Sequence, residues 1–233
     1  MHIPDGYLSP QTCGVMYAIS LPILAYASKK VIKNTSNRTL PLLGIFSAFS
    51  FLVMMFNVPV PGGTTAHGIG GTLIAIVLGP WEAVLAVSMA LFIQAVFFGD
   101  GGILAYGANV FNMAIALPLV GYGVYKLISK DAPFGSKRQL VAAAIGSYVG
   151  INAAALLDGI ELGIQPLLYH AANGTPLYCP YPLSQAVPAM MLAHLTIAGF
   201  VEVVITVGVL AFVYKYTPEI FALREGLNEK NIA

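Results

Sequence analysis

Long apolar stretches, separated by short polar or turn-forming segments, make up most of this sequence. A helix that crosses a membrane needs about 20 mainly apolar residues, and seven stretches have this character. We therefore expect an all-α membrane protein. Residues 1–216 should form one domain of seven transmembrane helices, and the polar tail, residues 217–233, a short interfacial helix or a frayed end. The expected spans are residues 11–29, 40–57, 65–78, 81–98, 103–128, 137–158 and 184–216.

The third stretch departs from the others because it is short and interrupted. Its 14 residues would make a helix of about 21 Å, whereas the hydrocarbon layer is about 30 Å thick. Such a segment predicts non-helical backbone at membrane depth, which is stable only where protein or water covers it. His67 stands at this break, which favours a functional role over that of a helix-end histidine facing outside water. The interrupting residues are Pro59, Pro61, Gly62, Gly63, Gly68, Gly70 and Gly71.

The basic residues fall into three groups that predict the orientation. With seven spans, all three groups lie on one side of the membrane, and the positive-inside rule makes that side the cytoplasm. The N-terminus and His67 are then expected outside, and the C-terminus in the cytoplasm. The groups are Lys29, Lys30, Lys33 and Arg38; Lys126, Lys130, Lys137 and Arg138; and Lys215, Arg224 and Lys230.

Composition supports this picture and limits the function classes. Only 9% of the 233 residues are charged and 58% are hydrophobic, whereas soluble domains are about 25% charged. The net charge of +1 argues against a nucleic-acid partner. Cys13 and Cys179 form no disulfide framework and no CxxC motif, which leaves open whether they pair. The first residues are polar rather than a basic and apolar signal peptide, so we expect Met1 to remain in the mature protein.

The N-terminus combines a chelating pair of residues with a turn. The Met1 amine, the His2 peptide nitrogen and His2 Nδ1 can close a five-membered and a six-membered ring around one metal ion. An all-nitrogen square plane suits Ni(II) or Cu(II). Pro4 then restricts the chain, and Asp5-Gly6 is a typical turn dipeptide. A chance histidine at position 2 is the alternative interpretation of these residues alone.

Other polar residues lie inside the expected spans. Five amides favour the outer half of the membrane, where they either hold an inserted N-terminal segment or bond neighbouring helices. They are Asn57, Gln94, Asn109, Asn112 and Asn152. His194 and Glu202 form either a proton relay or a structural hydrogen-bonded pair. His170 lies in the outer loop and is expected to be solvated.

Small residues recur at every fourth position of the sixth stretch. This spacing predicts a close-packing face, within the bundle or against a partner subunit. Packing within the bundle is the simpler interpretation. The residues are Ala142, Gly146, Gly150 and Ala154.

Over essentially its whole length, the chain resembles the substrate-binding membrane component of energy-coupling-factor importers for nickel or cobalt. The likeness rests on two motifs, Met1-His2-Ile3-Pro4-Asp5-Gly6-Tyr7-Leu8 at the N-terminus and Gly62-Gly63-Thr64-Thr65-Ala66-His67 in the third stretch. The resemblance implies that an N-terminal loop, residues 1–9, folds into the bundle. It also implies that Met1, His2 and His67 bind one divalent metal ion, the transported substrate.

The same resemblance implies the partners. The chain would be a transport subunit rather than an enzyme, in the cell membrane of a bacterium or archaeon. It would work with a transmembrane coupling subunit and cytoplasmic ATP-hydrolysing subunits, and often with an additional small membrane subunit, separate or fused. The sequence contains no Walker motif, so the energy must come from elsewhere.

Coordination chemistry favours nickel over cobalt. With His67 in the fourth position, the set is an amine, a peptide nitrogen and two imidazoles, and a planar nitrogen set suits d⁸ Ni(II) better than Co(II). The main alternative is a stand-alone secondary transporter of divalent metals that uses His194 and Glu202 as a proton relay, although no convincing inverted repeat supports it. An intramembrane metalloprotease is disfavoured because no His-Glu-x-x-His motif is present.

Overall fold

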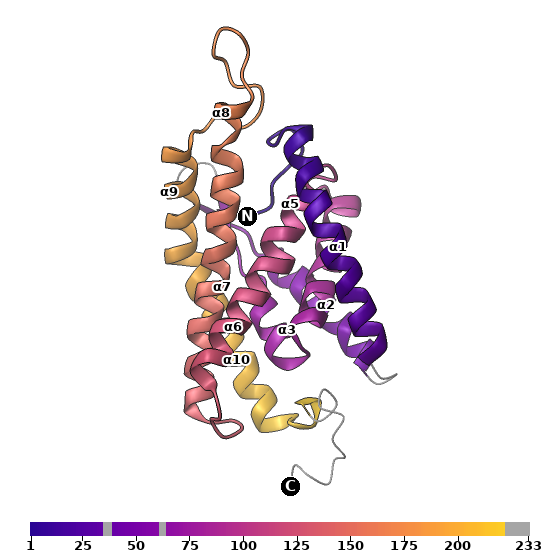
Figure 1. Cartoon of the computed structure of the whole chain (residues 1–233). Helices are drawn as coiled ribbons and strands as arrows, with labels where there is room; N and C mark the ends of the chain where they lie inside the picture. The colour runs from indigo at the N-terminus through magenta and orange to yellow at the C-terminus, as the bar shows by residue number, and fades with distance from the viewer. Residues whose placement is uncertain (35–38, 61–63, 222–233) are drawn as a thin grey trace.

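The computed structural model of the protein describes residues 1–34, 39–60 and 64–221, and these residues form a bundle of helices with a short β-hairpin (Figure 1). Within these described residues, five helical runs are long and apolar enough to cross a membrane. They are Pro10–Lys33, Pro80–Phe98, Tyr106–Ser129, Lys137–Leu168 and Leu183–Tyr216. The expectation of a helical membrane protein is confirmed at this level.

Individual elements follow the apolar stretches closely. The first half contains α1 Pro10–Asn34, α2 Thr39–Met54, β1 Val58–Val60, β2 Thr64–Ala66, α3 Gly71–Val77, α4 Pro80–Ile93 and the π-helical turn η1 Gln94–Phe98. The second half contains α5 Tyr106–Asn109, the π-helical segment η2 Val110–Ala116, α6 Leu117–Ser129, α7 Lys137–Gly163, α8 Gln165–Leu168, α9 Leu183–Ala193, the π-helical turn η3 His194–Ala198 and α10 Gly199–Tyr216. Local π-helix often marks a functional position, and Gln94 opens η1 while Asn109 directly precedes η2.

The third stretch is broken, as its glycines and its length predict. Its start is the strand β2, which pairs antiparallel with β1, and its end is α3, a helix of seven residues. Every residue of α3 is buried, and the helix packs against α4, α6, α7 and α10. The irregular backbone of residues 67–70 is therefore covered by protein rather than by lipid.

Helix α7 is central to one side of the bundle, where it packs against α6, α9 and α10. Two of its small residues face α6. A Cβ atom added at Gly146 would lie 2.6 Å from the Gly121 carbonyl oxygen, and one at Gly150 would lie 2.7 Å from that of Leu117. The small-residue face thus packs within the chain, because only glycine permits this approach of two backbones.

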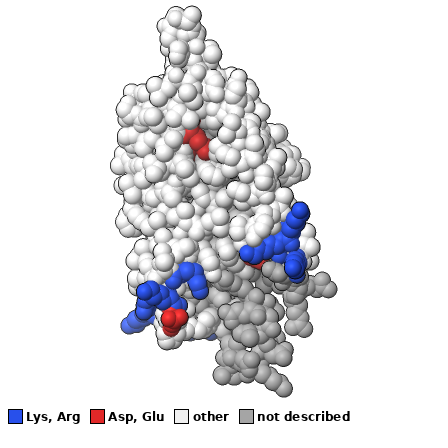
Figure 2. Space-filling model, viewed as in Figure 1, with Lys and Arg blue, Asp and Glu red and all other residues white. Residues whose placement is uncertain are grey.

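Charge is distributed unevenly along the bundle. Figure 2 shows Lys and Arg in two groups toward the lower end of the visible face, one near the C-terminal end of α1 and one near the turn between α6 and α7 in Figure 1. Arg38, Arg224 and Lys230 lie outside the described residues, as do Gly62 and Gly63. Of the polar tail, residues 217–221 begin a helical turn and the remainder lies outside the described part of the chain.

Candidate metal centre

The N-terminal segment enters the bundle instead of extending into solvent. Met1, Ile3 and Leu8 are each at most 3% exposed. The chain then turns at Asp5–Gly6, where Gly6 has a φ of 90° that favours glycine. Residues 4–7 are exposed, so the segment is buried or half-buried at its first three residues and buried at its last two, and its turn lies at the surface.

A single side chain clamps the peptide groups of Ile3. The Ile3 amide donates to Asn109 Oδ1 at 2.8 Å, and Asn109 Nδ2 donates to the Ile3 carbonyl at 3.0 Å. The same carbonyl accepts a second hydrogen bond, from the Gly102 amide at 2.9 Å. Because backbone groups buried without partners are costly, these bonds determine where the first three residues lie.

The turn that follows is held in a similar way. The Asp5 carboxylate accepts from the amides of Ile103 and Ala105 at 3.1 and 3.0 Å. The Tyr7 carbonyl accepts from the Cys179 amide at 3.0 Å, which ties the segment to the loop after α8. Asp5 is therefore an anchor as well as a turn residue.

The His2 side chain is oriented by Gln94. Its Nε2 lies 3.1 Å from Gln94 Oε1. The amide oxygen can only accept, so we assign the proton to Nε2 and the lone pair to Nδ1. Nδ1 lies 3.7 Å from Asp100 Oδ1, beyond hydrogen-bond distance. It is thus available as a ligand atom.

The His67 side chain has the complementary tautomer. Its Nδ1 donates to the Gly68 carbonyl at 3.0 Å, which leaves the lone pair on Nε2. His67 is 2% exposed, and Nε2 is buried with no hydrogen-bond partner among the described residues. The ring stacks on that of His2, with centroids 4.9 Å apart and planes 28° apart.

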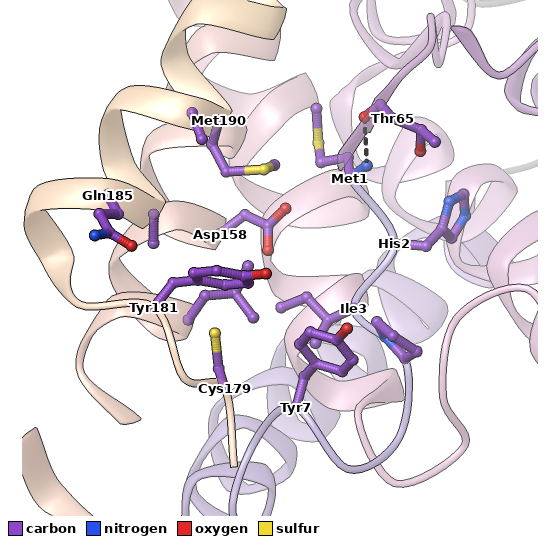
Figure 3. Close-up of a pocket in the computed structure, with 14 residues that line it drawn as sticks. Met1, His2, Ile3, Tyr7, Thr65, Asp158, Cys179, Tyr181, Gln185 and Met190 are labelled. Atoms are coloured by element: carbon purple, nitrogen blue, oxygen red, sulfur yellow. Dashed lines mark hydrogen bonds between the residues drawn. The ribbon is translucent and has the colours of Figure 1, made fainter. Parts of the chain in front are cut away.

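The Met1 amine completes the group of nitrogens. It donates to the Thr65 carbonyl of β2 at 3.2 Å, shown as the dashed line in Figure 3. Burial lowers the pKa of this amine, against a smaller opposing effect of the negative charges of Asp158 and Asp100. Burial, followed by the nearby amine charge, also lowers the pKa of His2 to about 4. Both shifts favour the neutral forms that can bind a metal.

The break before α3 is held by Glu202 of α10. Its carboxylate accepts from the Ile69 amide at 2.7 Å and from the Gly70 amide at 3.0 Å. His194 Nδ1 instead donates to the Met190 carbonyl at 2.8 Å. In the described part of the chain, neither side chain is hydrogen-bonded to the other, so these contacts favour the structural interpretation of the pair over a relay.

Three of the five outer amides have one of the two functions expected of them, whereas Asn152 bonds within its own helix and Asn57 has neither function among the described contacts. Gln94 and Asn109 hold the N-terminal segment, whereas Asn112 Nδ2 donates to Glu161 Oε2 and Asn152 Nδ2 to the Tyr148 carbonyl. Asn57 is exposed. Cys13 and Cys179 are buried free thiols.

Sequence reasoning missed three polar residues around this segment. The sequence identifies Asp5 only as a turn residue and Asp158 only as the last residue of the expected span 137–158. Gln165, whose Oε1 accepts from the Ser9 amide at 3.0 Å, was not considered. These positions are close together only in the folded structure, and their spacing in the sequence does not indicate this proximity.

The described residues contain no group of three or more His, Cys, Asp or Glu side chains placed to hold a metal ion. The candidate centre is of another kind. It brings together two imidazoles from His2 and His67, the Met1 amine and the peptide nitrogen between Met1 and His2. Such a set supplies nitrogen ligands only, two of them from the main chain.

Comparison with known proteins finds similarity to proteins named as metal transporters. The family model described as "Cobalt uptake substrate-specific transmembrane region" matches residues 2–220. The fused nickel transport protein NikMN of Rhodobacter capsulatus is 53% identical over 96% of this chain. The probable fused nickel transport protein LarMN of Lactiplantibacillus plantarum is also 53% identical, over 94% of this chain.

Lengths and folds can be compared as well. The chain spans 65% and 66% of those two curated relatives, slightly less than two thirds of each. A crystal structure described as that of a transition metal transporter matches with a TM-score of 0.90 and 56% identity over the full length of both chains. The helical arrangement of Figure 1 is thus shared with an experimentally observed protein.

Proposed function

The chain belongs to the family of cobalt uptake substrate-specific transmembrane regions, and from this membership we propose that it is the substrate-capturing subunit of an ATP-driven importer of the energy-coupling-factor class. Its substrate is Ni(II), with Co(II) as the second candidate. The ion binds at the Met1 amine, the peptide nitrogen and Nδ1 of His2, and His67 Nε2.

One observation carries this proposal. His67 Nε2 is buried, has a free lone pair and no partner among the described residues, and its ring stacks on His2 at 4.9 Å. A buried polar atom without a partner is costly, so a ligand at this point is the simplest explanation. Gln94 and the Gly68 carbonyl fix both imidazole tautomers so that Nδ1 of His2 and Nε2 of His67 are the free atoms, a typical arrangement around histidine ligands.

Binding follows from this geometry in a few steps. The Met1 amine leaves the Thr65 carbonyl and turns its lone pair to the ion. The His2 imidazole closes the six-membered ring through Nδ1, and the peptide nitrogen joins after losing its proton. His67 occupies the remaining in-plane position. Because ligation requires deprotonated nitrogens, binding releases protons.

Nickel is the proposed substrate for two reasons. A planar all-nitrogen set suits Ni(II), and both relatives compared above are named as nickel transport proteins. We propose further that seven segments, including α2 and the short α3, cross or enter the membrane, with the N-terminus outside. The Lys and Arg at one end of Figure 2 support this orientation. A coupling subunit and ATP-hydrolysing subunits then supply the energy.

The test compares two histidine variants of the purified protein. His67→Ala should lose nickel while remaining monodisperse, because it removes the fourth nitrogen. His170→Ala is the matched control, since His170 is exposed and its Nδ1 contacts only the adjacent Ala171 carbonyl among the described hydrogen bonds. The His170→Ala protein should retain one nickel ion per chain, measured by elemental analysis after gel filtration. A full equivalent of nickel on His67→Ala would overturn the proposed ligand set.

A further inference from the structure

A cavity of about 500 Å³ adjoins the N-terminal segment, and its lining includes Met1 and His2 but not His67. It runs from the surface to the Met1 side of the candidate centre, because Tyr7, Tyr181 and Gln185 on its lining are exposed whereas Asp158 and Met1 are buried. Figure 3 shows these residues around the space, contributed by the N-terminal segment, α7 and the start of α9.

Asp158 is the acidic residue of this lining. It is 1% exposed, and its Oδ1 is buried without a hydrogen-bond partner among the described residues. Figure 3 shows the carboxylate directed into the cavity, toward the space between Met1 and Tyr181. One turn further along α7, Glu161 differs because its Oε2 accepts from Asn112 at 2.8 Å. The charge of Asp158 acts on the nearby Met1 amine, but Oδ1 accepts no hydrogen bond from the described residues, and a buried carboxylate oxygen without one is costly. A cation bound in the cavity would supply this partner.

The volume suits a cation that still carries water. At roughly 30 Å³ for each water molecule, a cavity of about 500 Å³ has room for an ion with its first shell of waters and for several more. Small divalent ions dehydrate reluctantly and are commonly held through one or two carboxylates with waters retained. A single aspartate in a wet cavity fits such an ion better than a fully dehydrated one.

The charge distribution favours cations at this end of the protein. Asp158 lies 21 residues after Lys137 on α7, which is about 32 Å of helix and close to the thickness of the hydrocarbon layer. Lys and Arg gather at the opposite end in Figure 2. Asp158 lies in the cavity lining, Asp5 and Glu161 adjoin lining residues in the sequence, and Asp100 lies 3.7 Å from His2. Among the described residues here, the acidic side chains therefore outnumber the Met1 amine, which is the basic group that acts on Asp158 and Asp100. Such an asymmetry raises the local concentration of cations and their rate of arrival.

We propose that this cavity is a capture site, in which Asp158 holds a hydrated divalent cation before the ion loses its waters to the nitrogen set. The proposal rests on the proposed function, since the nitrogen set is the destination. Met1, His2 and Thr65 line the cavity as well as the candidate centre, so transfer needs only a short movement. Oxygen ligands and water bind the ion first, and the stronger nitrogen ligands then replace them.

The kinetic test uses Asp158→Asn, which keeps the size of the side chain and removes its charge. Nickel association, followed by stopped flow at low ionic strength, should slow by roughly tenfold or more, as expected for the loss of a steering charge. Asp131→Asn is the matched control, because it removes the same charge from the loop between α6 and α7 at the opposite end. A second variant, Ala189→Phe, keeps Asp158 but fills the cavity that Ala189 lines, and it should also slow association.

An equilibrium test separates this inference from the proposed function. Mn(II) prefers carboxylate and water ligands, and it is titrated to about 1 mM, the range of weak oxygen sites. Observed by electron paramagnetic resonance, it should bind to the His67→Ala protein and be lost in His67→Ala/Asp158→Asn. An unchanged nickel association rate in Asp158→Asn, or unchanged Mn(II) binding in the double variant, would overturn the capture site. Nickel retained by His67→Ala would overturn the proposed ligand set and leave the Mn(II) comparison valid.

Discussion

Removal of the Asn109 side chain tests whether the N-terminal segment is held as the structure indicates. In Asn109→Ala, the Ile3 amide loses its acceptor at 2.8 Å and the Ile3 carbonyl loses one of its two donors. A buried group left without a partner costs about 1–3 kcal/mol. Since about 1.4 kcal/mol corresponds to a factor of ten, the fraction of molecules with the segment released should rise between about 5- and 140-fold.

This release can be measured directly. The rate at which the Met1 amine is labelled by an amine-reactive aldehyde, or at which the Ile3 amide exchanges with deuterium, should rise by the same factor, because both need the segment to leave the bundle. The nickel affinity responds differently. It falls only when the released form becomes a substantial fraction of the protein, because the apparent affinity is reduced by the fraction that is competent to bind.

Asn152→Ala is the matched control for this experiment. Asn152 is also a buried amide, but its Nδ2 donates to the Tyr148 carbonyl of its own helix α7, and none of its described hydrogen bonds reaches the N-terminal segment. It should leave labelling of the Met1 amine unchanged even where it lowers the melting temperature. Equal labelling rates in Asn109→Ala and the unsubstituted protein would refute the clamp, because the released fraction would then be independent of the two bonds.

Three further predictions concern the same region. A glycine added before Met1 moves His2 to the third position, where the amine, two peptide nitrogens and the imidazole can fill all four in-plane sites without His67; uptake of radioactive nickel with the partner subunits present should then be lost, whereas a glycine added after Ala233 should leave uptake intact. The pKa of the His2 ring is about 6.5 when the N-terminal segment is released and about 4 when the segment is inserted in the bundle. Protonation of His2 therefore favours release, so insertion is fully favoured above about pH 6.5 and should weaken as the pH falls toward about 4. Calorimetry should show that the nickel affinity falls more steeply with pH once the pH reaches about 4. One additional proton released on nickel binding at about pH 6.5 would contradict burial of the ring. Glu202→Gln removes an acceptor from Ile69 or Gly70 and should lower both the melting temperature and the nickel content.

The apolar pattern predicted the helices well because long buried or lipid-facing helices leave a strong signal. The helical runs Pro80–Phe98, Tyr106–Ser129 and Leu183–Tyr216 agree with the expected spans within a few residues. The glycines and prolines also predicted the break around His67, because they exclude a regular helix there. The pattern could not show that Glu202, far away in the sequence, would hold this break through the amides of Ile69 and Gly70.

The candidate centre was predicted only in part. Position 2 is informative because an amine next to a histidine can chelate wherever the fold places it. Gln94 and Asn109 could be identified as buried amides, but two interpretations remained open, because a sequence does not show which buried donor meets which acceptor. Asp158 gave no signal at all. Its importance arises from the cavity beside Met1, which depends on the packing of α7, α9 and the N-terminal segment.

The proposed ligands differ from a typical metal centre in that half of them belong to the main chain. A main-chain nitrogen has no side-chain chemistry that sets it apart from other peptide groups, so its ability to bind depends on where neighbouring contacts hold it. Asn109 and the Gly102 amide place Ile3, Thr65 places the Met1 amine, and Gln94 turns the His2 ring. The preference for one metal must therefore reside largely in these anchors, because they set the angles at which four ordinary nitrogens meet the ion. A substitution at Gln94 should change which ion is preferred without removing any ligand, whereas a substitution at His67 should weaken the binding of every ion.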